Sequence, residues 1–249
     1  MTIKNKKIDY QCGEKMTELK GYKKINVYQK EGDYCVPAAI QWMLEWVRQE
    51  KKLDIGLTKE ELAGLQEEIF NQKKLSFKPI KEYLEEKYVN FPKDFLQVQA
   101  YKKEEGNLRF EQIKKLLGNN EPCAISLPEG IGVRAKREVL VFSQYVSHKE
   151  KNDNLFEKIQ NIYKRGEIAK NIGLRDWQEK KSRLGPEWDL IVYCHISPVV
   201  ECSDDSFTVK DLRGNETYHS YPKQFLIDWH EKIASNYAND IAWFKLSEK

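Results

Sequence analysis

A cysteine that begins a predicted helix soon after a glutamine is the feature of this sequence best suited to chemistry. Gln29 and Cys35 stand six residues apart in the run QKEGDYCVPAAIQWMLEW. The N–H groups at the start of a helix and the positive end of its dipole favour a thiolate over a thiol. Cys35 is therefore a candidate nucleophile, although most lone cysteines are packed as small hydrophobic residues.

A histidine and an aspartate much later in the chain could serve such a nucleophile. His195 and Asp211 stand sixteen residues apart, on two apolar runs separated by the polar turn 203–205. This pattern predicts a hairpin with strands over 191–200 and 206–209, which returns Asp211 toward His195. An aspartate there can accept the imidazole N–H, so that the other ring nitrogen takes the thiol proton. Considered alone, His195 is better interpreted as a buried structural histidine and Asp211 as a turn residue.

The elements that must position these residues are readable from local signals. The stretch after Cys35 is predicted to be a central helix, since apolar side chains recur along it at three- and four-residue spacings. These side chains are Ile40, Trp42, Met43, Leu44, Trp46 and Val47. Further helices are predicted from a capping box at Thr58 to about residue 72, over 76–87 and over 110–117. Strands are predicted over 95–101 and 122–127, so helices precede strands and the class is α+β.

Together these residues resemble the papain-like cysteine peptidases, most closely the bacteriocin-leader peptidase-like branch. In that family a glutamine precedes the nucleophile at the same spacing, the cysteine begins a helix with a proline and a small residue after it, and histidine and aspartate follow on paired strands. The matching positions are Gln29, Cys35, Pro37 and Ala38 in the first block and His195 and Asp211 in the second. The runs FEQIKKLLGNNEPCAISLP and YHSYPKQFLIDW are similar to the helix, turn and strand before the histidine and to the aromatic-rich helix after the acid.

The resemblance covers residues 25–130 and 188–245 and implies a papain-like two-lobe fold, with a helical lobe packed on an antiparallel sheet. It implies that Cys35 attacks a carbonyl carbon, that His195 protonates the leaving amine and that Asp211 orients the imidazole. Gln29 would donate its amide to the oxyanion. No metal or organic cofactor is required. We expect a polar, loosely ordered segment at 1–24 and a catalytic domain at 25–249 with an insertion at about 130–187.

The surroundings of the histidine and the acid depart from the family pattern. Family members usually carry glycine and an aromatic residue near the histidine and proline after the aspartate, whereas this chain has VYCHISP and KDLRG. Pro198 predicts an edge strand or a bulge at the histidine. If the spacing to Asp211 is a coincidence, His148 is the best substitute base, although its lysine-rich surroundings fit a solvated loop.

Several reactions share an acyl-enzyme at such a cysteine. A cysteine peptidase that hydrolyses a peptide or isopeptide bond is the favoured interpretation. The alternatives are a papain-like deamidase or transglutaminase acting on a protein glutamine, and a catalytically inactive binding domain of the same fold. The enzymes differ in whether water or an amine resolves the intermediate and in what the site admits.

Composition limits the partners. The net charge is only +3 with 33% charged residues, which is too balanced for a nucleic-acid binder. No apolar run approaches the roughly 18 residues of a membrane span, and the start MTIKNKKIDYQCGEK lacks the apolar region of a signal peptide. The five cysteines lack zinc-site spacing. We expect a protein or peptide substrate, no integral membrane segment, and a location in the cytoplasm or outside by a signal-independent route.

Overall fold

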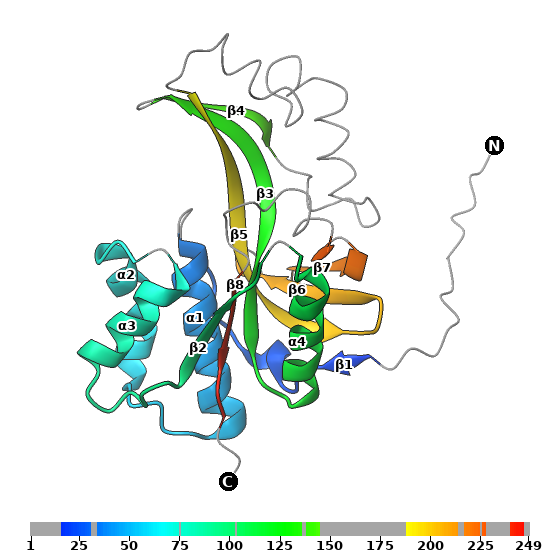
Figure 1. Cartoon of the computed structure of the whole chain (residues 1–249). Helices are drawn as coiled ribbons and strands as arrows, with labels where there is room; N and C mark the ends of the chain where they lie inside the picture. The colour runs from blue at the N-terminus through cyan, green and yellow to red at the C-terminus, as the bar shows by residue number, and fades with distance from the viewer. Residues whose placement is uncertain are drawn as a thin grey trace, which may run out of the picture.

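The computed structural model describes residues 16–30, 34–74, 76–102, 104–135, 138–144, 188–213, 217–224, 226–227 and 240–246, and of 128–135, 138–144, 188–194 and 217 the backbone only. Helices dominate the first half of the chain and antiparallel strands the second, so the predicted α+β class is confirmed (Figure 1). Most of the predicted insertion and His148 lie outside the described residues.

The helices follow the local signals in the sequence. They are α1 (Cys35–Trp46), the π-helical turn η3 (Val47–Lys51), α2 (Lys59–Asn71), α3 (Phe77–Lys87) and α4 (Gly106–Gly118), with a short 3-10 turn, η1 (Tyr22–Lys24), before them. The predicted capping box of α2 is confirmed, because Thr58 N–H donates to Glu61 Oε2 (2.7 Å) and Glu61 N–H donates to Thr58 Oγ1 (3.1 Å). Helix α4 begins one turn earlier than predicted. Its first turn buries Arg109, a charged residue that apolar periodicity does not detect.

Within the described residues, eight strands form one antiparallel sheet. They are β1 (Thr17–Glu18), β2 (Leu96–Ala100), β3 (Cys123–Ala135), β4 (Glu138–Gln144), β5 (Trp188–Cys202), β6 (Ser206–Asp211), β7 (Thr217–Pro222) and β8 (Asp240–Phe244). The order is β2-β8-β3-β5-β6-β7, while β1 pairs with β5 and β4 with β3. Strands β3 and β5 continue past the body of the fold, together with β4 (Figure 1).

The strand that carries the histidine is central, contrary to the edge position that Pro198 suggested. β5 lies between β3 and β6, and Pro198 pairs with Ala124 of β3. The pairing of β5 with β6 begins only at Val199, and its register shifts between Val199 and Glu201. Pro198 thus lies next to an irregularity in the ladder, which agrees with the alternative prediction of a bulge.

The predicted hairpin between β5 and β6 is confirmed. Its turn is built by Ser203, whose Oγ accepts the backbone N–H groups of Asp205 (3.2 Å) and Ser206 (3.1 Å). Such a side-chain bond replaces a backbone bond and is the reason that serine favours turns. The hairpin therefore sets His195 and Asp211 on neighbouring strands.

The structure corrects two other predictions. An aromatic-rich helix was expected in the run 218–229, but 218–222 belong to strand β7, which pairs with β6 from Ser206↔Pro222 to Asp211↔Thr217, and only 223–224 and 226–227 are helical among the described residues. Residues 16–24, expected to be loosely ordered, contain β1 and η1, and Leu19 and Tyr22 are buried. In both runs apolar side chains pack against the core among polar neighbours: Tyr218 and Tyr221 in the first, Leu19 and Tyr22 in the second.

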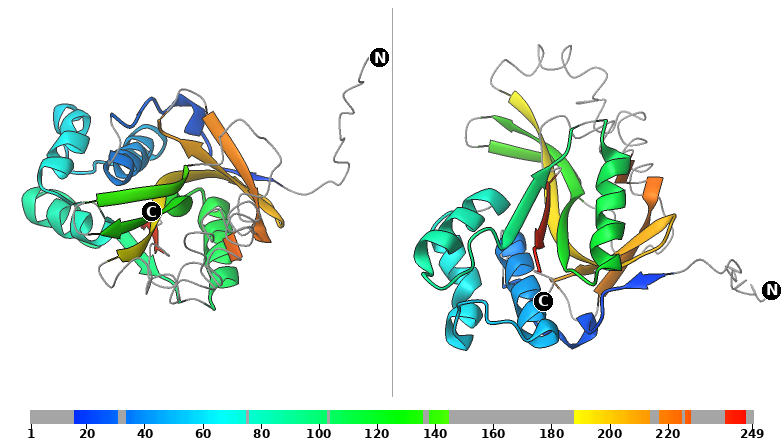
Figure 2. Two further views of the ribbon diagram at one scale, coloured as in Figure 1. Left: turned by 90° about the horizontal axis from the view of Figure 1, so that it is seen from above. Right: turned by 60° about the horizontal axis from the view of Figure 1, so that its bottom comes forward.

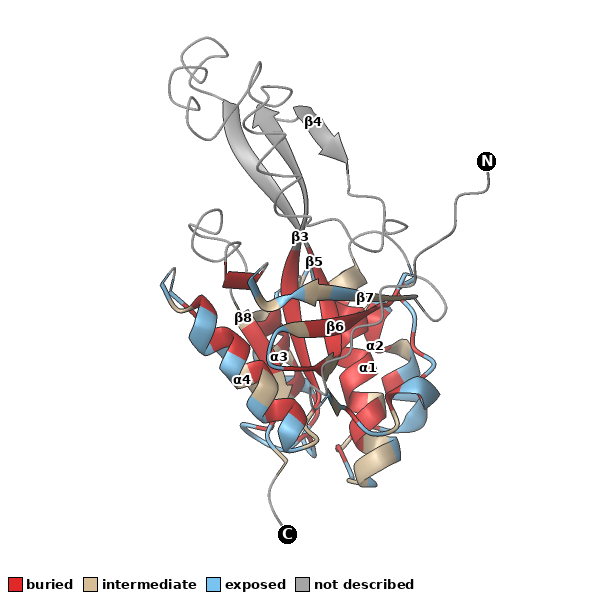
Figure 3. Cartoon of the chain, turned by 90° about the vertical axis from the view of Figure 1, so that its right-hand side faces the viewer, coloured by how far each residue is buried: buried red, intermediate tan, exposed pale blue. Residues whose placement is uncertain are grey.

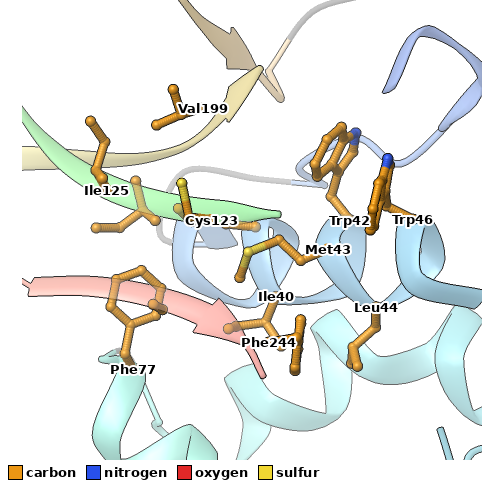
Figure 4. Packing of buried hydrophobic residues seen from close by; sticks show 14 of the residues in the cluster. Ile40, Trp42, Met43, Leu44, Trp46, Phe77, Cys123, Ile125, Val199 and Phe244 are labelled. Atoms are coloured by element: carbon orange, nitrogen blue, oxygen red, sulfur yellow. The ribbon is translucent and has the colours of Figure 1, made fainter. Parts of the chain in front are cut away.

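Helices cover both faces of the sheet. Helices α1, α2 and α3 lie on one side of β3 and β5, and α4 lies on the other (Figure 2). Buried residues line the strands and α1, whereas α4 carries buried residues toward the sheet and exposed residues outward (Figure 3). The core side chains shown in Figure 4 include Ile40 and Met43 of α1, Phe77 of α3, Cys123 and Ile125 of β3, Val199 of β5 and Phe244 of β8. The prediction that the Cys35 helix is central is thereby confirmed.

Candidate active site

Cys35 is the first residue of α1 and is partly buried. Pro37 lies in the first turn, where its missing N–H interrupts no helical bond. The first turn contains no acidic side chain, so no carboxylate of the helix itself offsets the positive end of the dipole beside the thiol. On the other side of the cysteine, the ring of Tyr34 stacks on Phe70 of α2, with 4.2 Å between ring centroids. This stacking fixes the chain that enters the helix.

His195 lies on β5, opposite Leu127 of β3, and its side chain is buried. The Cys35 thiol lies near enough to the imidazole to raise the pKa of His195. On its other side, Nε2 lies 3.5 Å from Oδ1 of Asp211. The imidazole thus stands between the thiol at the start of α1 and the carboxylate at the end of β6.

Asp211 is surrounded by cationic and titratable groups. Arg213 donates to Oδ1 from its backbone N–H (2.9 Å) and its Nε (3.1 Å), and to Oδ2 from Nη2 (2.9 Å). Nε2 of His219 lies 3.6 Å from Oδ2. Burial opposes ionisation of the carboxyl group, but the hydrogen bonds of His195, His219 and Arg213 outweigh it and hold the pKa of Asp211 well below its usual range. Asp211 is a carboxylate at every physiological pH.

The charge state of His195 follows from these neighbours. Burial by itself lowers the pKa of an imidazole, because it penalises the charged form. Hydrogen bonds to Asp211 and to Cys35 outweigh burial and raise the pKa of His195 to about 9. The imidazolium is therefore the favoured form of His195 at neutral pH, and it lies beside the Cys35 thiol.

Gln29 is brought to the same place by the sheet. Its backbone N–H donates to the carbonyl oxygen of Leu212 at 2.7 Å, directly after Asp211. The residue is 9% exposed, which is low for a glutamine. The structure thus places all four residues singled out from the sequence, Gln29, Cys35, His195 and Asp211, around the start of α1 and the end of β6.

Two residues of the site were not singled out from the sequence, Arg213 and His219. His219 pairs with Val209 across β6 and β7, two residues from the Asp211↔Thr217 pair, so His219 and Asp211 are diagonal neighbours on one face of the sheet. The threonine and two tyrosines of TYHSYP could have indicated this strand, because β-branched and aromatic residues favour strands. Arg213 was read only as part of the turn after Asp211, although an arginine two residues from an aspartate can close a local bidentate pair.

No group of three or more His, Cys, Asp or Glu side chains in the described part of the chain is arranged to hold a metal ion. The three cysteines whose side chains are described, Cys35, Cys123 and Cys202, are free thiols. Among the described helices, none is both long and apolar enough to cross a membrane. In comparisons with known proteins, no family model, no curated protein and no solved structure matches the chain.

Proposed function

We propose that this protein is a cysteine peptidase, a thiol-dependent hydrolase of a peptide or isopeptide bond, with Cys35, His195 and Asp211 as its triad. The observation that carries the proposal is that one buried imidazole lies between the thiol at a helix start, which raises the pKa of the imidazole, and a buried carboxylate oxygen 3.5 Å from its Nε2. Nucleophile, base and orienting acid in this relation are the elements of thiol catalysis.

The chemistry can be assigned by role. The Cys35 thiol gives its proton to His195, and the thiolate attacks the carbonyl carbon of the substrate to form a C–S bond. His195 then protonates the leaving amine as the C–N bond breaks, which leaves a thioester on Cys35. Water, deprotonated by His195, hydrolyses the thioester and restores the thiol. The raised pKa of His195 supports the first step, because it favours the ion pair over two neutral groups.

Gln29 is the proposed side-chain donor to the oxyanion, together with the backbone N–H of Cys35. Its hydrogen bond to Leu212 O and its low exposure support this role, since both keep its amide beside the triad rather than in solvent. A donor of this kind contributes roughly a hundred- to a thousandfold in rate, because it meets negative charge that develops only in the transition state.

The fold that fits this proposal is the papain-like plan. In it, the layer of α1, α2 and α3 would be the lobe that carries the nucleophile, and the sheet with β5 and β6 would carry His195 and Asp211. The position of Cys35 at the boundary between the two layers supports this assignment.

The test is the pH dependence of Cys35 alkylation by iodoacetamide. The wild type is compared with His195→Ala, and Cys35→Ser provides the blank for the other cysteines. We expect rapid labelling well below pH 8 in the wild type and loss of that low-pH phase in His195→Ala, because only the ion pair supplies thiolate at that pH. Labelling of Cys35 at the rate of an ordinary thiol, unchanged in His195→Ala, would rule out the triad.

A further inference from the structure

A buried glutamine on α2 holds the backbone on both sides of Gln29. Gln66 is 2% exposed. Its Nε2 donates to the carbonyl oxygen of Tyr28 at 2.8 Å, and its Oε1 accepts the backbone N–H of Lys30 at 3.3 Å. One side-chain amide therefore brackets the proposed oxyanion donor from the residue before it and the residue after it.

The orientation of this amide is set by the nucleophile helix. Nε2 of Gln66 also donates to Oε1 of Gln41, on α1, at 2.6 Å. A primary amide has two N–H donors, and here one reaches Gln41 and the other Tyr28 O, so the oxygen is turned toward Lys30. Because Gln41 belongs to the same helix as Cys35, the network connects the backbone of Gln29 to the element that carries the proposed nucleophile.

The opposite side of this segment is held by β6. Lys210 Nζ donates to the carbonyl oxygen of Ile25 at 3.0 Å, and Gln29 N–H donates to Leu212 O. The segment 25–30 is thus held between the sheet that carries Asp211 and the helices that carry Cys35. Oxyanion donors act only when they are held within tenths of an ångström of the developing charge, so such two-sided support matters to the site.

We propose that Gln66 is a positioning residue for the oxyanion donor Gln29. This inference rests on the proposed function, in which Gln29 donates to the oxyanion. Gln66 touches no reacting atom and acts only through the 28–30 backbone, so its loss lowers the stabilisation of an oxyanion without altering the Cys35–His195 pair. A glutamine that merely joined two helices would show no such selectivity.

The probe is N-acetylglycinal, a small aldehyde. The Cys35 thiolate adds to its carbonyl carbon, so that a C–S bond forms and the C=O π bond breaks. The oxygen of the resulting thiohemiacetal takes the imidazolium proton and still accepts the hydrogen bond that Gln29 donates. The inhibition constant is read from protection of Cys35 against iodoacetamide. Alkylation by iodoacetamide displaces iodide at a methylene carbon and creates no oxyanion, so its rate reports the ion pair alone.

The variants are Gln29→Ala, Gln66→Met and the double variant, with Gln72→Met as the matched control. Gln72 follows the same helix but is exposed. We expect Gln29→Ala and Gln66→Met each to weaken aldehyde binding by about tenfold or more, and the double variant to lose no more than Gln29→Ala alone. Low-pH alkylation should stay at the wild-type rate in Gln66→Met, and Gln72→Met should match the wild type throughout.

Failure of the positioning role and failure of the proposed function would give different results. Wild-type aldehyde affinity in Gln66→Met, or losses that add in the double variant, would overturn the positioning role while leaving the triad intact. A wild type whose Cys35 alkylates like an ordinary thiol would overturn the proposed function itself. If thermal melting shows that Gln66→Met does not fold, Gln66→Glu takes its place. That carboxylate can still accept from Lys30 N–H but cannot donate to Tyr28 O, so the same weakening is expected, and unweakened binding would refute the inference.

Discussion

The two halves of the candidate site are held by different forces. Gln29 and Cys35 stand six residues apart and are held by the start of α1 and by neutral hydrogen bonds to the sheet and to α2. Asp211 instead lies within a cluster of charged and titratable groups on the strands and the following turn. Neutral bonds of this kind are individually modest, whereas a buried charge without its partners is costly. Substitutions in the first half should therefore lower reactivity, and substitutions in the second should lower stability.

Asp211→Ala is expected to have the largest effect on stability. Removal of the carboxylate leaves Arg213, His195 and His219 facing one another without their counter-charge. We expect the free energy of unfolding to fall by about 3–5 kcal/mol, measured by urea denaturation. Asp204→Ala is the control, because its ion pair with Lys114 is exposed and should contribute nothing measurable. A loss in Asp211→Ala no larger than in Asp204→Ala would contradict the contrast.

A second effect is the pH dependence of stability that His195 contributes. Its pKa is about 9 in the folded protein against 6.5 for an ordinary histidine, so between these values the folded state binds more protons than the unfolded state. The stabilisation is complete below about pH 6.5 and is lost as the pH rises through about 9, a change of on the order of 3 kcal/mol. Urea titrations at pH 6 and pH 9.5 should show this fall in the wild type and a smaller one in His195→Gln. Equal falls in both proteins would refute the assignment.

Thr58→Ala tests a local hydrogen bond in the helical half of the fold. It removes one of the two reciprocal bonds of the α2 capping box, and we expect a loss of about 1 kcal/mol in the free energy of unfolding. The low-pH alkylation of Cys35 should not change, since the cap lies outside the network around Gln66. Thr58→Ser keeps the hydroxyl and should retain wild-type stability; a loss equal to that of Thr58→Ala would show that the methyl group, not the cap, is responsible.

The smallest effect expected is that of His219→Gln. Arg213 keeps its three hydrogen bonds to Asp211 in this variant, so the loss of unfolding free energy should stay below about 1 kcal/mol. Arg213→Gln, measured in parallel, should lose more, because two side-chain bonds to a buried carboxylate disappear. The reverse order would mean that His219, and not Arg213, is the main partner that holds Asp211.

Local elements were the part of the fold that sequence patterns predicted well. The helix start at Cys35, the Thr58 capping box and the 203–205 turn each depend on residues a few positions apart, and all three are confirmed. The patterns missed the early start of α4 and the strand at 217–222. In α4 the charged residue Arg109 is buried. In β7 the polar residues belong to a strand that pairs with β6. The spacing of apolar residues does not predict a charged residue that becomes buried only through tertiary contacts.

The sequence alone was enough to predict the chemical groups of the candidate site and the elements that carry them, because turns, caps and helix starts are local. The contacts of these groups depend on the tertiary structure. Strand β7 brings His219 to Asp211, and α2 brings Gln66 to the backbone of residues 28 and 30, which are 38 and 36 positions away along the chain. Such contacts depend on strand register and on the packing of helices against a sheet, and neither is encoded in any short stretch of sequence.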